Sequence, residues 1–220
     1  PEALDTSIHW NEYAELPDYK LQHVNETMLA INKDYPIGGM ILYAHNIVDE
    51  AQLGEFIAEI RELNGSPLLA IDEEGGRVAR IANNENFDVP KYESMAAIAE
   101  SGDPNEANKA AFSIGSYVKE YGFDIDYAPV ADVNTNPENI VIGPRAFSDD
   151  PETAAKFVVS YLNGLDSAGV IGTLKHFPGH GDVKTDTHSG YAATNKTWEE
   201  MLECEMVPFK AGIKAGAKMV

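Results

Sequence analysis

Short apolar runs alternate with amphipathic segments along most of this 220-residue chain. Runs of strand length and high apolar content occupy 38–43, 68–71, 125–130 and 170–174. Segments with apolar residues at helical spacing follow them. Strands that are apolar throughout and alternate with helices predict a parallel sheet with helices outside it. We therefore expect a single α/β domain over residues 1–220.

Capping signals set the expected helix boundaries. Asp49 precedes a helix that Gly65 ends, and Asp150-Pro151 begins another that Gly169 ends. Further helices are predicted over 104–122 and 198–214, and the first half of another strand over 217–220. An irregular stretch is expected from the end of the second strand to about Asp103.

Polar residues stand at the carboxyl ends of the first four predicted strands. They are His45 and Asn46, the run from Asp72 to Arg77, Asp132 and Asn134, and the run that starts at Lys175. A barrel collects side chains from many strand ends on one face, whereas an open sheet concentrates them at one switch point. The pattern favours a TIM-type (β/α)8 barrel. Such a barrel needs roughly 250 residues, so four to five βα units make it incomplete in this chain.

Charge and composition exclude several classes of partner. A formal charge of -20 disfavours nucleic acid and anionic membrane surfaces, which require clustered Lys and Arg. The sequence has no apolar run near the roughly 18 residues of a membrane helix. It has no Gly-x-Gly-x-x-Gly turn and no Walker-type loop either, so we expect no nucleotide cofactor. Cys204 is alone, and the chain begins at Pro1, so neither feature predicts a compartment.

The segment from Lys175 to His188 concentrates reactive side chains. It contains three histidines, two aspartates and two lysines within fourteen residues, broken by glycines and a proline. Such a stretch predicts a polar loop that surrounds a ligand. A zinc or iron site is one alternative, with donors from His176, His180, Asp182, Asp186 and His188. Against it, His176 and His180 flank Pro178 and therefore do not share a helix face.

Four motifs together resemble glycoside hydrolase family 3, in particular its bacterial β-N-acetylhexosaminidase branch. They begin at Asp72 (DEEGGRV), Ala128 (APVADVN), Val141 (VIGPRAF) and Lys175 (KHFPGHGD). An Asp-x-His follows the last motif at Asp186. The resemblance spans about residues 37–220. It implies a TIM-type barrel that releases β-linked N-acetylglucosamine from the non-reducing end of cell-wall or chitin-type saccharides, with retention of configuration.

The resemblance also assigns roles to single residues. Asp72, Arg145, Lys175 and His176 match the residues that bind the sugar. His188 matches a histidine general acid/base and Asp186 its partner, with no metal and no cofactor. The family's nucleophile is an aspartate on a later strand, which we expect beyond Val220, and the strand that opens the barrel is expected before Pro1. The fragment alone is then predicted to be inactive.

The residue types suit this chemistry. A retaining glycosidase needs one group that first protonates the leaving oxygen and then activates water, and a histidine with a near-neutral pKa does both. Asp132 and Asn134 either bind substrate or stabilise the turn before Arg145, and the turn is the favoured interpretation. His180 and Asp182 are expected to brace the loop. Phosphorolysis remains an alternative, because a neutral histidine does not repel phosphate. So do a non-catalytic sugar-binding barrel and a metal-binding one. The expected partner is a small saccharide or muropeptide.

Overall fold

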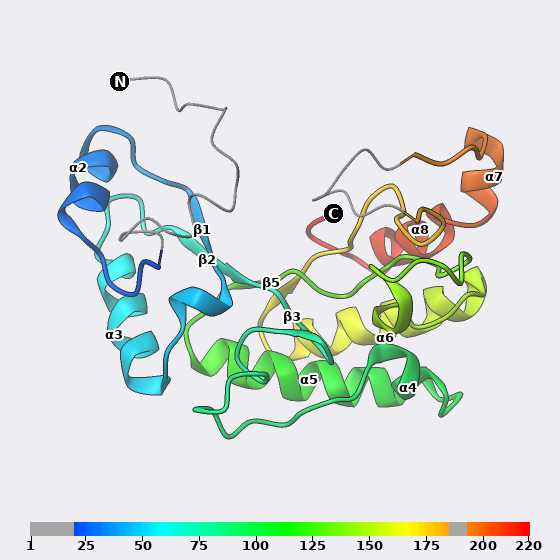
Figure 1. Ribbon diagram of the computed structural model, residues 1–220, viewed down its shortest axis with the longest axis horizontal. Coiled ribbons are helices and arrows are strands. Elements are labelled where there is room, and N and C mark those ends of the chain that lie inside the picture. The colour runs from blue at the N-terminus through cyan, green and yellow to red at the C-terminus, as the bar shows by residue number, and fades with distance from the viewer. Residues whose placement is uncertain (1–19, 185–192) are drawn as a thin grey trace.

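The computed structural model describes residues 20–184 and 193–220, whose four-stranded sheet is entirely parallel (Figure 1). The strands lie in chain order, β1 (Gly39–Leu42), β2 (Leu68–Ile71), β5 (Ile125–Asp126) and β6 (Ile171–Gly172). Leu42 pairs with Ile71, Ile71 with Asp126, and Asp126 with Gly172. All carboxyl ends therefore lie at the same edge. This is the arrangement of a partial (β/α) barrel, as the sequence predicted.

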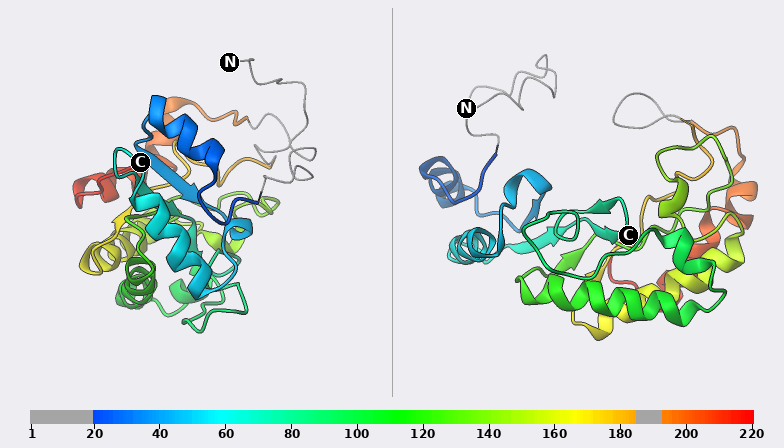
Figure 2. Two further views of the ribbon diagram at one scale, coloured as in Figure 1. Left: turned by 90° about the vertical axis from the view of Figure 1, so that its left-hand side faces the viewer. Right: turned by 60° about the horizontal axis from the view of Figure 1, so that its bottom comes forward.

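The helices between the strands form where their caps predict. α3 (Glu50–Arg61) begins after Asp49, whose side chain accepts a hydrogen bond from the Gln52 N–H. α6 (Pro151–Ser167) begins after Asp150, which accepts one from the Thr153 N–H. α5 (Pro104–Glu120) lies alongside α6 beneath the sheet (Figures 1 and 2). A helix that the sequence analysis did not identify, α2 (Glu26–Asp34), precedes β1.

Side-chain alternation along the strands separates two faces of the sheet. Leu69 and Ile71 are buried in the main core with apolar residues of α3, α5 and α6. Leu68 and Ala70 point the other way and line a groove of about 340 Å³ together with Met219. The helix-covered face holds the large side chains of the core. Among them are Phe56, Ile60, Phe123, Tyr161 and Phe157.

The stretch predicted as irregular after β2 contains a short hairpin and a helix. β3 (Glu73–Gly75) pairs antiparallel with β4 (Val78–Ala79), and α4 (Met95–Ala99) follows. The buried Glu73 carboxylate accepts hydrogen bonds from the N–H groups of residues 80–82 and from the Tyr117 hydroxyl. Burial raises the pKa of Glu73, and these bonds only partly offset that rise. Glu73 thus holds the backbone of residues 80–82 in place, and with it the position of Arg80.

Two predicted elements differ from the structure because of proline. The strand expected over 125–130 is regular only at 125–126, since Pro129 has no N–H for the ladder, and pairing resumes as one bridge between Val130 and Lys175. The helix expected over 198–214 is two helices, α7 (Trp198–Glu203) and α8 (Met206–Lys214). Pro208 cannot donate to the carbonyl of Cys204, and the break falls there.

The remaining boundaries are close to the predicted ones. The strand expected over 217–220 appears as a single parallel bridge between Thr173 and Met219. Two short 3-10 helices occupy strand exits, η1 (Ala44–Asn46) and η2 (Gly143–Arg145). His45 lies in η1, and its ring stacks on Tyr43. No helix among residues 20–184 and 193–220 is long and apolar enough to cross a membrane.

The contact between α5 and α6 depends on Gly164. A Cβ there would lie 2.4 Å from the Asn108 carbonyl oxygen and 2.7 Å from the Ala111 Cβ. We expect Gly164→Ala to lower the free energy of unfolding by about 2 kcal/mol, because two packed helices must separate. Gly54→Ala is the control, because Gly54 lies on α3 with open space around its Cβ position. That substitution should stabilise by about 0.5–1 kcal/mol. Denaturant unfolding of both variants tests the contact, and equal effects would contradict it.

Candidate functional site

The four residues predicted to bind a sugar lie together at the carboxyl edge of the sheet. Asp72 follows β2, Lys175 and His176 follow β6, and Arg145 ends η2. The Lys175 Nζ lies 2.7 Å from Asp72 Oδ1, although the two residues are 103 positions apart. The Arg145 Nη2 lies 3.2 Å from His176 Nε2. The structure thus brings all four into one polar cluster.

Glu74 joins the two halves of this cluster, and the sequence analysis missed it. Its side chain is 1% exposed. It accepts two hydrogen bonds from Arg145, at 2.8 Å from Nε and 2.6 Å from Nη2, and Lys175 Nζ lies 2.6 Å from Oε1. The sequence did contain a signal for Glu74. It belongs to the same motif as Asp72 and stands three residues after the end of a buried strand. We call Asp72, Glu74, Arg145, Lys175 and His176 the strand-end cluster.

Opposite charges in this region favour the charged forms of Asp72 and Arg145. Burial alone would raise the pKa of Asp72, but Lys175 and Arg80 together lower it below its ordinary value. Burial would likewise lower the pKa of Arg145, and the paired Glu74 carboxylate raises it instead. Arg80 Nη2 lies 3.3 Å from Asp72 Oδ2, which adds a further cation at the rim. Charged donors and acceptors of this kind make strong hydrogen bonds to hydroxyl groups.

Asp132 orients His176. The Asp132 side chain is fully buried, and its Oδ2 lies 2.6 Å from His176 Nδ1. Its Oδ1 accepts from the His180 N–H at 2.6 Å and the His176 N–H at 3.3 Å. Because arginine only donates, the neighbouring Arg145 requires His176 Nε2 to be an acceptor. These partners assign a neutral ring protonated at Nδ1. Asp132 therefore braces the loop and also fixes one ring of the strand-end cluster.

The other residues of the 175–188 segment do not all join the cluster. Asp182 contacts Thr135, Thr194 and Lys196 instead. His180 is buried, its ring centroid lies 6.1 Å from that of His176, and in the described chain neither of its ring nitrogens has a hydrogen-bond partner. The loop-bracing role predicted for both residues agrees with these positions. Asp186 and His188 lie outside the described residues.

The remaining expectations for this region concern Asn134 and a metal. The Asn134 backbone N–H donates to the Ser148 carbonyl at 3.1 Å, which fits its assignment to the turn before Arg145. Within residues 20–184 and 193–220, no group of three or more His, Cys, Asp or Glu side chains is arranged to hold a metal ion. Asp182, one of the proposed donors, is occupied by hydroxyl and ammonium groups.

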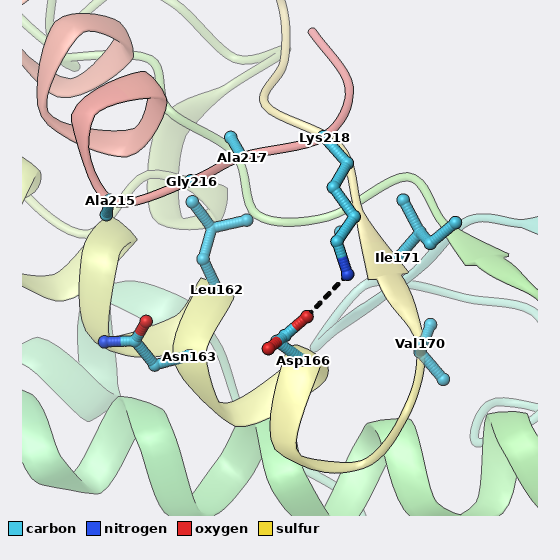
Figure 3. Close-up of a pocket in the computed structure, with 10 residues that line it drawn as sticks. Leu162, Asn163, Asp166, Val170, Ile171, Ala215, Gly216, Ala217 and Lys218 are labelled. Carbon is cyan, nitrogen blue, oxygen red and sulfur yellow. Dashed lines mark hydrogen bonds and ion pairs between the residues drawn. The ribbon is translucent and has the colours of Figure 1, made fainter.

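A pocket of about 180 Å³ lies at the opposite end of β6 (Figure 3). Val170 and Ile171 line it where the strand begins, and Lys218 pairs there with Asp166 at 2.7 Å. Barrel enzymes place their chemistry at the carboxyl ends of the strands. With its lysine neutralised and no second reactive group among its lining residues, this pocket is not the candidate site.

Comparison with known proteins shows the family of the chain and agrees with its fold. The glycosyl hydrolase family 3 N-terminal domain matches residues 11–220. The chain belongs to this family. The same residues that form the strand-end cluster lie within the matched range. The TIM-type barrel expected from the strand exits is therefore the fold of a known family of glycosidases.

Curated relatives of the chain include bacterial β-hexosaminidases. One from Xylella fastidiosa is 42% identical over 194 residues, which is 86% of this chain and 56% of that protein. One from Stenotrophomonas maltophilia is 38% identical over 84% of this chain and 55% of that protein. The chain thus spans little more than half the length of the curated relatives it matches.

Solved structures of the family superpose closely. A family 3 β-N-acetylglucosaminidase from Paenibacillus gives a TM-score of 0.80 at 33% identity, over 89% of this chain and 38% of that one. NagZ from Neisseria gonorrhoeae in complex with N-trifluoroacetyl-D-glucosamine gives 0.82 at 27% identity, over 91% of this chain and 60% of that one.

The lowered pKa of Asp72 predicts a pH-dependent contribution to stability. Its folded-state pKa lies below the ordinary value of 3.8, so the unfolded chain binds the proton more readily. The stabilisation is present above about pH 4 and is lost as the pH falls through the folded-state pKa. The difference in Tm between wild type and Asp72→Asn should therefore shrink on acidification. Asp166→Asn, which removes an exposed ion pair, is the control and should change Tm little. A difference that stays constant down to the acid limit would contradict this assignment.

The role of Asp132 predicts a change of tautomer in Asp132→Asn. An asparagine oxygen keeps the backbone hydrogen bonds, but its amide nitrogen cannot accept from Nδ1–H. Nitrogen-15 NMR of the histidine rings should show His176 as the neutral Nδ1–H form in wild type and a loss of that form in the variant. We expect a destabilisation of about 1–3 kcal/mol as well. His176→Gln assigns the signal, and an unchanged His176 signal in Asp132→Asn would refute the role.

Proposed function

We propose that this chain supplies the sugar-binding part of the active site of a retaining glycosidase, which releases β-linked N-acetylglucosamine from the non-reducing end of saccharides. The observation that carries the proposal is the strand-end cluster. Carboxylate and cation alternate from Asp72 through Lys175 and Glu74 to Arg145, which contacts the His176 ring, and the five residues come from three separate strand exits. Their side chains are largely buried and hold one another in place, so the site is formed before the ligand arrives.

The cluster suits a polyhydroxylated ring. Asp72 is an ionised acceptor with 17% of its side chain exposed, and Lys175 and Arg145 are donors with 13% and 11% exposed. Each hydroxyl of a pyranose both donates and accepts, so adjacent charged donors and acceptors can hold it in a fixed orientation. The names of the relatives support N-acetylglucosamine as the sugar: β-hexosaminidase, β-N-acetylglucosaminidase, and NagZ bound to an N-acylated glucosamine. The natural saccharide would be a cell-wall or chitin-type fragment.

The catalytic step is assigned to His188 with Asp186 as its partner. In the first step His188 would protonate the departing glycosidic oxygen while a carboxylate nucleophile attacks the anomeric carbon. In the second step His188 would remove a proton from the water that attacks the same carbon. Asp186 stands two residues earlier, where a carboxylate favours the imidazolium that donates the proton. The strand-end cluster, in this proposal, fixes the sugar so that its glycosidic oxygen faces His188.

The assay of an aryl β-N-acetylglucosaminide tests the function. A protein with the native gene boundaries should release the chromophore, and this 220-residue chain, assayed beside it, should not. Product formation with and without inorganic phosphate separates hydrolysis from phosphorolysis. Absence of turnover by the longer protein would refute the glycosidase assignment. Turnover by the 220-residue chain alone would refute the need for a nucleophile outside it.

Arg145→Lys tests the cluster. A lysine cannot make the paired hydrogen bonds to Glu74, so we expect kcat/KM for the aryl substrate to fall by about a hundredfold. Arg61→Lys is the matched control. Arg61 also anchors a carboxylate, Asp124 at 2.6 Å, but at the amino edge of the sheet. That variant should lose stability and keep its kcat/KM. Similar losses of kcat/KM in both variants would show that Arg145 acts only through folding.

A further inference from the structure

Glu74 stands at an irregularity of the β3–β4 hairpin. The strand β4 pairs with Glu73 and with Gly75, but the register shifts between them, at Glu74. A shift of this kind aims a side chain in a new direction and disrupts the ladder around it. The hairpin alone therefore does not fix the carboxylate that holds both cations of the strand-end cluster. The backbone of Glu74 needs support from outside the hairpin.

Two fully buried side chains from other elements supply this support. Asp126 of β5 accepts a hydrogen bond from the Glu73 N–H at 2.9 Å through its Oδ1. The Tyr161 hydroxyl of α6 donates to the Glu74 carbonyl at 3.1 Å. Both Asp126 and Tyr161 are 0% exposed. The backbone at the register shift is thus tied to the sheet by one side chain and to the helix layer by the other.

Tyr161 also contacts the segment that carries Arg145. Its ring centroid lies 5.9 Å from that of Phe147, which stands two residues after Arg145. Phe147 in turn stacks on Phe157 of the same helix. One side chain of α6 therefore contacts the chain beside both partners of the Glu74–Arg145 pair. That pair has two hydrogen bonds, of 2.8 Å and 2.6 Å, so its geometry depends on the placement of both partners.

The Tyr161 hydroxyl remains a donor at neutral pH. Burial raises its pKa, and the neighbouring carboxylates of Asp126, Glu74 and Glu73 raise it further. A neutral hydroxyl therefore faces the Glu74 carbonyl under the conditions of an activity assay.

We propose that Tyr161 is a positioning residue for sugar binding: its hydroxyl fixes the backbone of Glu74 and its ring fixes the segment after Arg145, so that carboxylate and guanidinium meet in their paired geometry. The inference rests on the proposed function of the strand-end cluster. Without the hydroxyl, the Glu74 carbonyl loses a buried donor and the backbone at the register shift moves. Arg145 then meets the sugar from a displaced position, and small displacements of such groups reduce rates strongly.

Tyr161→Phe in the protein with native gene boundaries tests this role. The variant keeps the ring that contacts Phe147 and removes only the hydroxyl. We expect kcat/KM for an aryl β-N-acetylglucosaminide to fall by about tenfold. In the Arg145→Lys background the same substitution should reduce kcat/KM by less than about threefold, because effects that act through one ion pair do not add. A general loss of stability would instead reduce kcat/KM equally in both backgrounds.

The Arg145 Nε–H gives a signal that does not depend on activity, because it donates to Glu74 Oε2 at 2.8 Å. Its nitrogen-15 NMR resonance, assigned by its absence in Arg145→Lys, should shift in Tyr161→Phe. Tyr121→Phe is the matched control. It removes a hydroxyl that donates to Glu50 at 2.8 Å beside the C-terminus of α5, and it should change neither kcat/KM nor this resonance.

Three results would each overturn the positioning role of Tyr161: a wild-type kcat/KM in Tyr161→Phe, the full loss of kcat/KM in the Arg145→Lys background, or an unmoved Arg145 resonance. The Tm of each variant checks that it is folded at the assay temperature. A wild-type protein that cleaves the aryl substrate establishes the proposed function independently of the variants. A wild-type protein without turnover overturns that function and this inference with it.

Discussion

The buried carboxylate of Glu74 is the interaction on which the site depends. Removing an ionised carboxylate from water costs several kcal/mol unless strong partners replace the water. Arg145 replaces it through two hydrogen bonds and Lys175 through an ammonium at 2.6 Å. Neither cation can leave without exposing an uncompensated buried charge. The protein therefore fixes both cations at the strand ends, and Asp72 and His176 contact these fixed groups.

Preorganisation of this kind connects the fold to the chemistry. Parallel strands in chain order place their carboxyl ends at one edge, and residues from distant parts of the chain meet there. Residues around the cluster then hold its side chains in position. Asp132 orients His176, and Glu73 binds the backbone of the loop from which Arg80 reaches Asp72. A sugar that enters meets side chains whose positions are already set, so less of its binding free energy is spent on ordering them.

Apolar periodicity and caps predicted most of the fold from the sequence. α3 and α6 begin after Asp49 and Asp150 because a cap is local chemistry that needs no tertiary partner. The strand at 125–130 and the helix at 198–214 were predicted too long, because the apolar pattern continues across Pro129 and Pro208 while backbone hydrogen bonding does not. The β3–β4 hairpin was missed since its stability comes from a buried glutamate, a tertiary feature without periodicity.

The sequence predicted most residues of the site but not the contacts that hold them together. The motifs pointed to Asp72, Arg145, Lys175 and His176, and the structure brings these four together. Glu74 was missed although it belongs to the motif of Asp72. The orienting role of Asp132 could not be found, because a sequence does not show whether a carboxylate is buried or which groups it contacts. Only the three-dimensional contacts show that Glu74 has cations on both oxygens.

The opposite orientations of Glu73 and Glu74 limit how the length of the chain can vary after β2. Glu73 points away from the site into the backbone of residues 80–82, and Glu74 points toward the cations. Successive residues of an extended chain face opposite sides, so inserting or deleting one residue between Ile71 and Glu73 would turn Glu73 toward the cations and Glu74 away from them. The distance along the chain from the last core residue of β2 to Glu74 is therefore under as strict a constraint as the identity of any side chain in the cluster. Insertions and deletions in this part of the barrel should be tolerated only after the β3–β4 hairpin, where the side a residue faces no longer depends on its distance from β2.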